Sequence, residues 1–515
     1  MAATTDYATL YRELEARWPA IATTILVLLM VLLLPRLLRP DPLAGIPVVG
    51  DGHKGFMKRG GWAIYTEGYN KFKEGVFRVA TARQSKVLVV SPKFLPELKK
   101  LPDDVLSFAG AVEESMQSKY TKIDSDVPSL PHTVKTSLTP SLAHLNPTIY
   151  NEVEEAMRLE LPQTADWTEV NINSKLLRIV AMASGRIFVG PELCRDEAYL
   201  DASINYTVDL MTAVHILQFT PPWLRPIVAR FLPQVKKLQR RIQEADNFLR
   251  PVVAARRREA AENPDYQKPD DMLQWIIDSQ QKFGAKDDKE LAKNQLGISF
   301  AAIHTTTLTT TNAFYTLAAM PEVIPMLRED VQQALAESGG EFTSLAMQNM
   351  KKLDSFMKEV LRYYPLSAAS FQRRVLKPFT LSNGQTIPPG VIIEVPAGSM
   401  NYDSDIHDEP YQFDPLRYYK LRESKGAAAS ATKAAEVVAN SQFVSVGTTS
   451  LTFGYGRHAC PGRFFAVNEI KMVMATALLH YDIKNVPGVT GRYENMQIGA
   501  QSVPDPKKTI MMRKL

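Results

Sequence analysis

The chain has 515 residues, of which 45% are hydrophobic and 22% are charged, a composition typical of a globular protein with a large core. Its formal net charge is only +5, and no basic stripe with interleaved aromatic residues occurs, which argues against a nucleic-acid partner. The two cysteines, Cys194 and Cys460, exclude a disulfide-rich scaffold and a structural zinc site built from cysteine pairs. If one of them binds a metal, no internal disulfide can form, and a reducing compartment is expected.

The N-terminal region carries an uncharged apolar run, residues 18–34, with arginines on both sides. As a helix this run spans about 25 Å, slightly less than a bilayer core, and leucines beyond the next proline extend it to residue 38. We therefore expect one transmembrane anchor at residues 18–38, a lumenal segment at residues 1–17, and a large domain at residues 39–515 on the cytosolic side. A cleaved signal peptide is the alternative, but prolines rather than small residues follow the run.

The large domain is predicted to be mainly α with small β-sheets. Residues 76–80 and 86–90 have the pattern of two short strands around a polar turn. Residues 94–376 show mostly helical periodicity, interrupted by Pro and Gly. A second β-rich stretch covers residues 379–395, where an Asn-Gly pair predicts a hairpin turn. Residues 424–441 are rich in Ala, Ser and Lys and indicate a flexible surface insertion.

Residues 221–233 are apolar with interspersed arginines and prolines. One interpretation is a loop and helix start that pack on the core. The other is a second patch that dips into the interfacial layer of a membrane beside the anchor. The sequence leaves both open.

Residues 453–462 place Cys460 after a glycine-rich stretch and before a helical pattern that begins with Pro461. A thiol at a helix N-terminus has a lowered pKa, and the thiolate is the form that binds iron. A buried free cysteine is the competing interpretation. The spacing of Phe, Gly, His, Cys and Gly in this segment resembles the haem-binding signature of the cytochrome P-450 family. The resemblance implies that Cys460 is the iron ligand, that Phe453 packs under the ring, and that His458 reaches a haem propionate.

Glu359 and Arg362 resemble the family's Glu-x-x-Arg helix pair, because residues three apart share a helix face and can form an ion pair. The same spacing occurs at Glu192 and Arg195, so we rely on the position of the pair ahead of the β-rich stretch and the cysteine loop. Arg417 lies in a segment that resembles the family's Pro-x-Arg and is the third partner. We expect a buried structural triad that is costly to break one partner at a time.

Residues 297–319 form a long apolar run with many threonines, whose β-branched side chains alone favour a strand. We expect a helix, because the run is too long for a typical strand. Residues 301–306 resemble the family's central-helix motif, and Thr305 falls on its key threonine, which can bond to the preceding turn and distort the helix. The sequence departs from the motif at Ala302, usually Gly, and at His304, usually an acid. His304 is either a proton relay or a packed residue.

Haem propionates need cationic or donor partners, because buried carboxylates require pairing. Arg373 matches the family's arginine after the Glu-x-x-Arg helix. Lys135 and His132 lie where the family usually has Trp-x-x-x-Arg, although this sequence has no Trp there. For each cation the alternative is a solvated surface charge.

The resemblance covers the chain from the proline-rich hinge to the C-terminus, with the motifs in the family's order. It implies one helical domain with minor sheets that binds haem b and acts as a monooxygenase with O₂ and electrons from NADPH. No flavin-binding region is evident, so we expect a separate NADPH–cytochrome P-450 reductase, whose acidic surface Arg457 and Lys471 would face. The expected location is the membrane of the endoplasmic reticulum.

Residues 301–306 and 457–466 are similar to fungal secondary-metabolism members of the family, and the ent-kaurene-oxidase-like group is the nearest. This likeness implies a lipophilic, terpenoid substrate that is hydroxylated or oxidised several times. Two alternatives remain open. One is a haem-thiolate isomerase or dehydratase that acts without O₂, which the changes at Ala302 and His304 keep in view. The other is a non-enzymatic haem protein, a sensor or scaffold.

Overall fold

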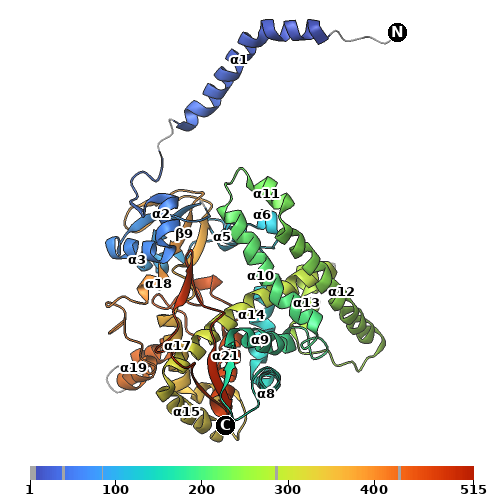
Figure 1. Cartoon of the computed structure of the whole chain (residues 1–515), viewed down its shortest axis with the longest axis vertical. Coiled ribbons are helices and arrows are strands. Elements are labelled where there is room, and N and C mark those ends of the chain that lie inside the picture. Colours follow the sequence, from blue (N-terminus) through green and yellow to red (C-terminus); the bar gives the residue numbers. More distant parts are fainter. Residues whose placement is uncertain (1–6, 38–40, 84, 285–287, 427–430) are drawn as a thin grey trace. The chain divides into compact units, whose positions relative to one another are not determined.

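The structure is a computed structural model that describes residues 7–37, 41–83, 85–284, 288–426 and 431–515 (Figure 1). The chain divides into two compact units, Met1–Pro47 and Val48–Leu515. The predicted boundary between anchor and domain, at residues 38–40, lies outside the described residues, as do residues 1–6 of the predicted lumenal segment.

The first unit contains one helix, α1 (Tyr7–Leu37), which includes most of the predicted anchor. Its threonine hydroxyls bond inside the helix: Thr23 Oγ1 donates to Pro19 O at 2.7 Å, so this polar group needs no external partner. The side chains of residues 7–14 and 32–37 lie outside the description. Among the residues that are described, no helix has both the length and the apolar character needed to cross a bilayer.

The second unit is mainly helical. Its α-helices are α2 (Gly52–Arg59), α3 (Gly61–Lys71), α4 (Leu95–Leu98), α5 (Phe108–Ser115), α6 (Ser118–Thr121), α7 (Ser129–Thr133), α8 (Thr139–Glu160), α9 (Ile172–Phe188), α10 (Glu197–Phe219), α11 (Arg225–Phe231), α12 (Pro233–Glu262), α13 (Met272–Phe283), α14 (Asp288–Ala319), α15 (Ile324–Ala336), α16 (Ser344–Asn349), α17 (Lys351–Tyr363), α18 (Ala397–Met400), α19 (Arg417–Gly426), α20 (Ala431–Asn440) and α21 (Arg463–His480). The turn η2 (Val134–Leu138) is π-helical.

The strands form small separate sheets. They are β1 (Val48–Val49), β2 (Val76–Ala80), β3 (Lys86–Val90), β4 (Leu106–Ser107), β5 (Thr168–Val170), β6 (Ser370–Val375), β7 (Phe379–Thr380), β8 (Thr386–Ile387), β9 (Ile392–Val395), β10 (Tyr481–Asn485), β11 (Asn495–Ile498), β12 (Gln501–Pro504) and β13 (Ile510–Lys514). The largest sheet has the order β1-β2-β3-β9-β6-β4, and a second has the order β10-β13-β5. This architecture confirms the predicted class, mainly α with small β-sheets.

Helix α14 runs through the core and packs on α9, α10 and α12. The helix predicted for residues 297–319 is therefore confirmed, and the strand that propensity favours does not form. The threonine hydroxyls explain part of this outcome. Thr310 Oγ1 donates to Thr306 O at 2.8 Å and Thr316 Oγ1 donates to Asn312 O at 2.7 Å, so these buried groups are satisfied within the helix itself.

The predicted β segments also form. β2 and β3 pair antiparallel from Val76↔Val90 to Ala80↔Lys86. The predicted hairpin turn joins β7 and β8, and Gly384 has the positive φ of 84° that such a turn requires. Residues 427–430 of the expected flexible insertion lie outside the described residues, and helix α20 occupies most of the rest. Alanine is the strongest helix former, and this segment is rich in it.

Candidate active site

The loop that carries Cys460 folds back on itself before α21 begins. Cys460 N donates to Phe453 O at 2.7 Å, which closes the loop at its base. Gly454 and Gly456 both have φ of 74°, a conformation that side chains rarely adopt. The N-cap of α21 is Gly462, so Pro461 precedes the helix and is not its first residue, contrary to the prediction.

The electrostatic surroundings of Cys460 also differ from the prediction. Burial raises the pKa of the Cys460 thiol, while hydrogen bonds from the backbone N–H groups of Gly462 and Arg463 and the charge of Arg463 oppose that rise. The predicted net lowering of the Cys460 pKa does not occur in the protein alone, because burial outweighs these opposing contributions. A bound cation would deprotonate the thiol, since coordinating thiols lose their proton. By contrast, burial raises the pKa of Cys194 to about 11, and the charge of Glu152 reinforces the shift.

Arg373, on β6, is a buried cation with no acidic partner. Its Nη1 donates to the neighbouring carbonyl Gln372 O at 2.7 Å, and its guanidinium lies 4.3 Å from the ring centroid of Phe371 and 5.2 Å from that of Phe108. No carboxylate of the described chain lies within ion-pair distance. Burial lowers the pKa of Arg373 to about 10. An uncompensated buried charge is costly, so this site suits an anionic group supplied by a ligand.

The two histidines predicted to bind a haem propionate, His458 and His132, make other contacts in the structure. His458 Nε2 lies 2.7 Å from Asp103 Oδ1, and its ring stacks on Phe108 at 5.2 Å. His458 and Arg373 nevertheless line one small pocket. His132 lies in α7, with its Nε2 3.3 Å from Lys282 Nζ, so its described contacts are to α13.

Lys135 lies in the π-helical turn η2 and its side chain is exposed. The structure does not bring this side chain to Arg373 or to the Cys460 loop among the contacts of the described residues. A solvated surface charge, the alternative stated for it above, is consistent with this exposure.

Thr305 lies in the middle of α14 and keeps its side chain exposed, although most of its neighbours in the helix are buried. Its Oγ1 donates to Ala301 O at 2.7 Å, the i−4 bond that the sequence predicts. Ala301 is exposed on the same face, one turn earlier. The helix continues through this position without interruption, so the bond does not break the helix.

His304 points away from Thr305, toward α10. Its Nε2 lies 2.9 Å from the carbonyl Ile204 O, and because a carbonyl only accepts, the ring donates there. Burial lowers the pKa of His304, so the imidazole is neutral at pH 7. The contact links α14 to α10.

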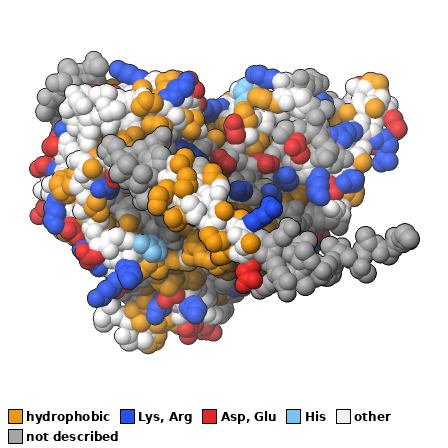
Figure 2. Space-filling view, turned by 90° about the horizontal axis from the view of Figure 1, so that it is seen from above, with side chains coloured by type: hydrophobic (Ala, Val, Ile, Leu, Met, Phe, Trp, Pro, Cys, Tyr) orange, Lys and Arg blue, Asp and Glu red, His pale blue; other side chains and the backbone are white. Residues whose placement is uncertain are grey.

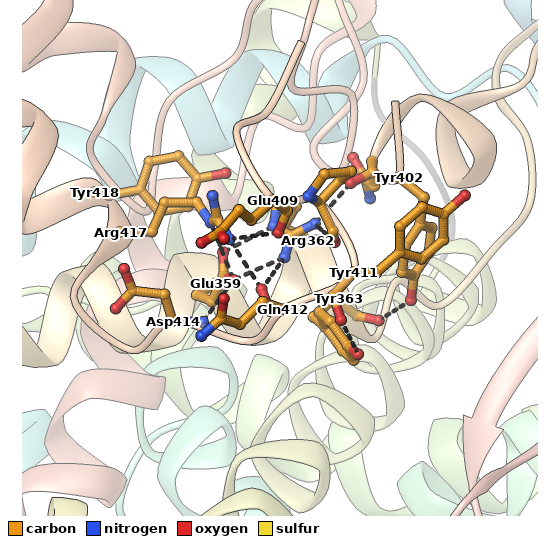
Figure 3. A network of polar contacts seen from close by, with 12 residues as sticks. Glu359, Arg362, Tyr363, Tyr402, Glu409, Tyr411, Gln412, Asp414, Arg417 and Tyr418 are labelled. Atoms are coloured by element: carbon orange, nitrogen blue, oxygen red, sulfur yellow. Dashed lines mark hydrogen bonds and ion pairs between the residues drawn. The ribbon is translucent and has the colours of Figure 1, made fainter. Parts of the chain in front are cut away.

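Glu359, Arg362 and Arg417 meet in one buried network (Figure 3). Arg362 donates to both carboxylate oxygens of Glu359, at 2.8 and 2.7 Å, and Arg417 Nε donates to Oε1 at 3.1 Å. The remaining guanidinium N–H groups bind backbone carbonyls, which the sequence does not reveal: Asn401 O, Pro410 O and Gln412 O from Arg362, and Asp408 O, Glu409 O and Gln412 O from Arg417. The network therefore ties α17 to the start of α19 and the chain before it.

A second buried network lies one turn earlier on α17 and was not predicted. Asp354 accepts from Lys471 Nζ at 2.9 Å and from the backbone N–H of Phe443 at 3.0 Å, and it also pairs with Arg422. Phe443 precedes the Cys460 loop and Lys471 follows it on α21. One carboxylate thus holds the chain on both sides of the loop.

Lys471 is buried in this network and is only 3% exposed, so the prediction that it faces an electron-transfer partner is wrong. Its Nζ pairs with Asp354 Oδ1 at 2.9 Å and donates to Met347 O at 2.7 Å, so the ammonium group is held in the core and cannot dock another protein. Arg457 keeps 42% of its side chain exposed, with Nη1 3.7 Å from Asp103 Oδ1.

The chain belongs to the cytochrome P450 family. The family model named Cytochrome P450 matches residues 40–511. Cytochrome P450 monooxygenase ATR3 of Stachybotrys chlorohalonatus is 41% identical over 431 residues, covering 84% of this chain and 89% of the relative. Cytochrome P450 monooxygenase AN1598 of Emericella nidulans is 37% identical over 466 residues, covering 89% of this chain and 84% of the relative. Cytochrome P450 monooxygenase braC of Annulohypoxylon truncatum is 35% identical over 500 residues, covering 96% of this chain and 97% of the relative.

The protein is accordingly a cytochrome P450 monooxygenase, and the isomerase and non-enzymatic alternatives are set aside. The family implies a haem cofactor, a reductase and a small-molecule substrate. The residues present fit a haem. The unpaired guanidinium of Arg373 suits a propionate, and the N–H groups of Gly462 and Arg463 suit a thiolate at Cys460.

We expect Glu359→Gln to lower the free energy of unfolding by about 3–5 kcal/mol, because it leaves two buried guanidinium groups short of their counter-ion. Urea unfolding followed by far-ultraviolet circular dichroism measures the change. Glu192→Gln is the matched control, since Glu192 has the same spacing to an arginine but is largely exposed, and it should change stability by less than about 0.5 kcal/mol. Equal effects of the two substitutions would contradict the structural role of Glu359.

His407 predicts a pH dependence of stability. Burial and the charges of Arg362 and Arg417 lower its pKa to about 4, and its Nε2 is buried without a hydrogen-bond partner. The unfolded chain takes up a proton below about pH 6.5, whereas the folded protein stays neutral there until about pH 4. His407 therefore contributes stability above pH 6.5 that is lost as the pH falls toward 4. His407→Gln should flatten the fall in urea midpoint between pH 7 and pH 5, and an unchanged fall would contradict this assignment.

Proposed function

We propose that this monooxygenase oxidises a lipophilic secondary metabolite of terpenoid type, by one hydroxylation or several successive oxidations. The observation that carries the proposal is the exposed pair Ala301 and Thr305 in the middle of α14, a small apolar surface beside one hydroxyl in a stretch of helix that is otherwise buried or half-buried. Such a surface favours an apolar substrate over a charged one. The names of the related proteins are those of fungal monooxygenases, which supports secondary metabolism, and the likeness of residues 301–306 and 457–466 to the ent-kaurene-oxidase-like group supports a terpenoid.

We propose that Cys460 binds haem iron through its thiolate and that Arg373 pairs with a propionate, with Phe453 packed against the ring. The haem, when bound, supplies the activation of O₂ by electrons from NADPH. The ring of Phe453 packs on that of Phe443, at a centroid distance of 6.2 Å. His458, Lys135 and His132 are weaker candidates for the propionates, because their present contacts lie elsewhere.

We propose that Thr305 positions the water or hydroxyl that delivers protons. Its O–H donates to Ala301 O at 2.7 Å, so its lone pairs are free to accept a hydrogen bond from a water on the exposed face. The relay proposed for His304 has less support, because its ring is neutral and donates to Ile204 O. We infer that His304 fixes α14 against α10 and leaves proton transfer to Thr305 and solvent.

We propose that the protein is anchored to the endoplasmic reticulum by residues 18–38, with the catalytic domain in the cytosol. The uncharged run is one argument, and α11 is another. Large apolar side chains on α11 and in the turn before it are exposed, with 54% of Ile227, 70% of Phe231 and 76% of Trp223 accessible. Hydrophobic side chains gather over the middle of the face shown in Figure 2. An exposed apolar helix favours the interfacial interpretation of residues 221–233 over a fully packed loop.

We propose NADPH–cytochrome P-450 reductase as the electron donor. Two residues, Arg457 and Lys471, were predicted to contact this partner. Arg457 is half exposed in the Cys460 loop and remains available to an acidic partner, whereas Lys471 is buried.

Replacing Cys460 with Ala should abolish the thiolate-type ferrous–CO spectrum, because no other described cysteine lies in this loop. Cys194→Ala is the matched control and should leave the spectrum unchanged, since burial holds the Cys194 thiol protonated. A thiolate-type spectrum in Cys460→Ala would overturn the assignment of the ligand.

Replacing Thr305 with Ala should divert reducing equivalents to hydrogen peroxide, because the hydroxyl that positions the proton source is lost. The ratio of peroxide to NADPH consumed measures this uncoupling. His304→Asp should leave the ratio unchanged and lower stability, since the bond to Ile204 O is lost. Better coupling in His304→Asp would instead support a relay at this position, and intact coupling in Thr305→Ala would disprove the role of Thr305.

A further inference from the structure

The ring of Phe108, the first residue of α5, contacts two side chains of the candidate active site. The guanidinium of Arg373 lies 5.2 Å from the ring centroid. The imidazole of His458 stacks on the same ring at 5.2 Å, with an angle of 20° between the two planes. α5, β6 and the Cys460 loop are far apart in the sequence. Phe108 thus joins the strand that carries Arg373 to the loop that carries the cysteine.

A second ring, that of Phe371, contacts Arg373 from within β6. Its centroid lies 4.3 Å from the guanidinium, and both residues are buried, each with 5% of its surface exposed. Phe371 has φ of 53°, in the left-handed region that glycine favours. β6 carries one extra residue at this point, because Ser370 pairs with Val395 and Arg373 pairs with Ile393. Contacts of the Phe371 side chain must offset the strain of this bulge.

The backbone beside the bulge is fixed by Gln372. Its Nε2 donates to Glu394 Oε1 at 3.0 Å, and Glu394 is a buried residue of β9 that also pairs with Arg83. The carbonyl oxygen of Gln372 accepts the hydrogen bond from Arg373 Nη1 at 2.7 Å. The backbone that carries Arg373 is therefore anchored to β9, and the two rings decide where the guanidinium lies.

Aromatic rings hold a guanidinium without using its hydrogen-bond donors. They attract the charge through their π electrons, whereas a carboxylate would occupy the N–H groups. Over the part of the chain that the structure describes, the guanidinium of Arg373 makes one hydrogen bond, although such a group has five N–H donors. The nearby carboxylate of Asp103 is bound by His458 Nε2 at 2.7 Å. Arg373 thus keeps most of its donors for an anion from outside the chain.

We propose that Phe108 and Phe371 are positioning residues for the haem, which hold the guanidinium of Arg373 in place and leave its N–H groups free for a propionate carboxylate. The proposal rests on the pairing of Arg373 with a propionate that is proposed above. Because Phe108 also stacks on His458, the position of Arg373 is coupled to that of the Cys460 loop. Loss of either ring should weaken the attraction for a propionate while the arginine and the cysteine both remain.

The test uses the haem-loaded full chain and measures the rate at which haem passes to excess apomyoglobin. Each variant is loaded either with haem b or with haem dimethyl ester, in which both propionates are uncharged esters. Phe108→Leu and Phe371→Leu keep an apolar side chain and remove the aromatic ring, and Arg373→Leu removes the cation.

Two further variants serve as controls. Phe283→Leu is the matched control, because the ring of Phe283 also contacts a histidine and a cation but lies in α13. Its centroid is 5.3 Å from that of His132 and 5.7 Å from Lys282 Nζ. Phe108→Tyr keeps an aromatic ring next to Arg373. Both control variants should lose haem at the rate of the unchanged protein.

With haem b, Phe371→Leu should raise the rate of haem loss by about tenfold to thirtyfold, as expected for the loss of one desolvated cation–π contact. Phe108→Leu should raise it by about threefold to fivefold, because Phe108 is more exposed. With haem dimethyl ester neither substitution should change the rate, since the ester offers Arg373 no anion. An equal effect on both forms of haem would overturn the proposal. If Phe371→Leu takes up no haem, the comparison of Phe108→Leu with Phe108→Tyr decides.

Arg373→Leu separates this proposal from the one on which it rests. It should speed the loss of haem b at least as much as either phenylalanine substitution, and it should leave the loss of the ester unchanged. If it does so while Phe108→Leu and Phe371→Leu both match Phe283→Leu, the two rings have no positioning role. If Arg373→Leu itself leaves the loss of haem b unchanged, Arg373 does not bind a propionate and the proposed function is wrong at that point.

Discussion

The position of the Cys460 loop depends on one buried carboxylate, that of Asp354. It binds Phe443 N before the loop and Lys471 Nζ after it, at 3.0 and 2.9 Å. Glu359 lies about one turn further along the same helix and holds the chain that leads into α19. α17 therefore carries two fixed anions: Asp354 holds the chain on both sides of the Cys460 loop, and Glu359 holds the chain that leads into α19.

Several buried cations in this fold donate hydrogen bonds to backbone carbonyls, some of them in addition to an ion pair. Lys358 donates to Asn440 O at 2.6 Å and to Gln442 O at 2.8 Å, and burial lowers its pKa to about 7. Arg362 and Arg225 likewise bind several carbonyls. Carbonyls at helix ends and in irregular chain lack partners of their own, so each cation satisfies groups that would otherwise be buried unpaired. These hydrogen bonds offset the cost of burying the charge, and they also fix loops that have no regular hydrogen-bonding pattern.

Local patterns were enough to predict the helix around Thr305, the strands around residue 80 and the meeting of Glu359 with Arg362, because each depends on periodicity or on a spacing of a few residues. Side-chain direction was harder. Lys471 proved buried, and His458 turned to Asp103, since both outcomes depend on partners more than 100 residues away. The sequence does not reveal the hydrogen bonds of Arg225, because backbone carbonyls accept most of them and every residue has a carbonyl.

The threonines of α14 have a consequence for how the enzyme can change over generations. Thr305, Thr309 and Thr310 each bond to a carbonyl of their own helix, at 2.7, 2.9 and 2.8 Å. A substitution at such a position removes the hydroxyl donor and its hydrogen bond together. It leaves no acceptor unpaired on another element, because the helical carbonyl keeps its backbone N–H partner. The exposed face of α14 at Thr305 can thus change without the loss of hydrogen bonds to other elements. Related enzymes that keep the same core can therefore evolve to act on different substrates.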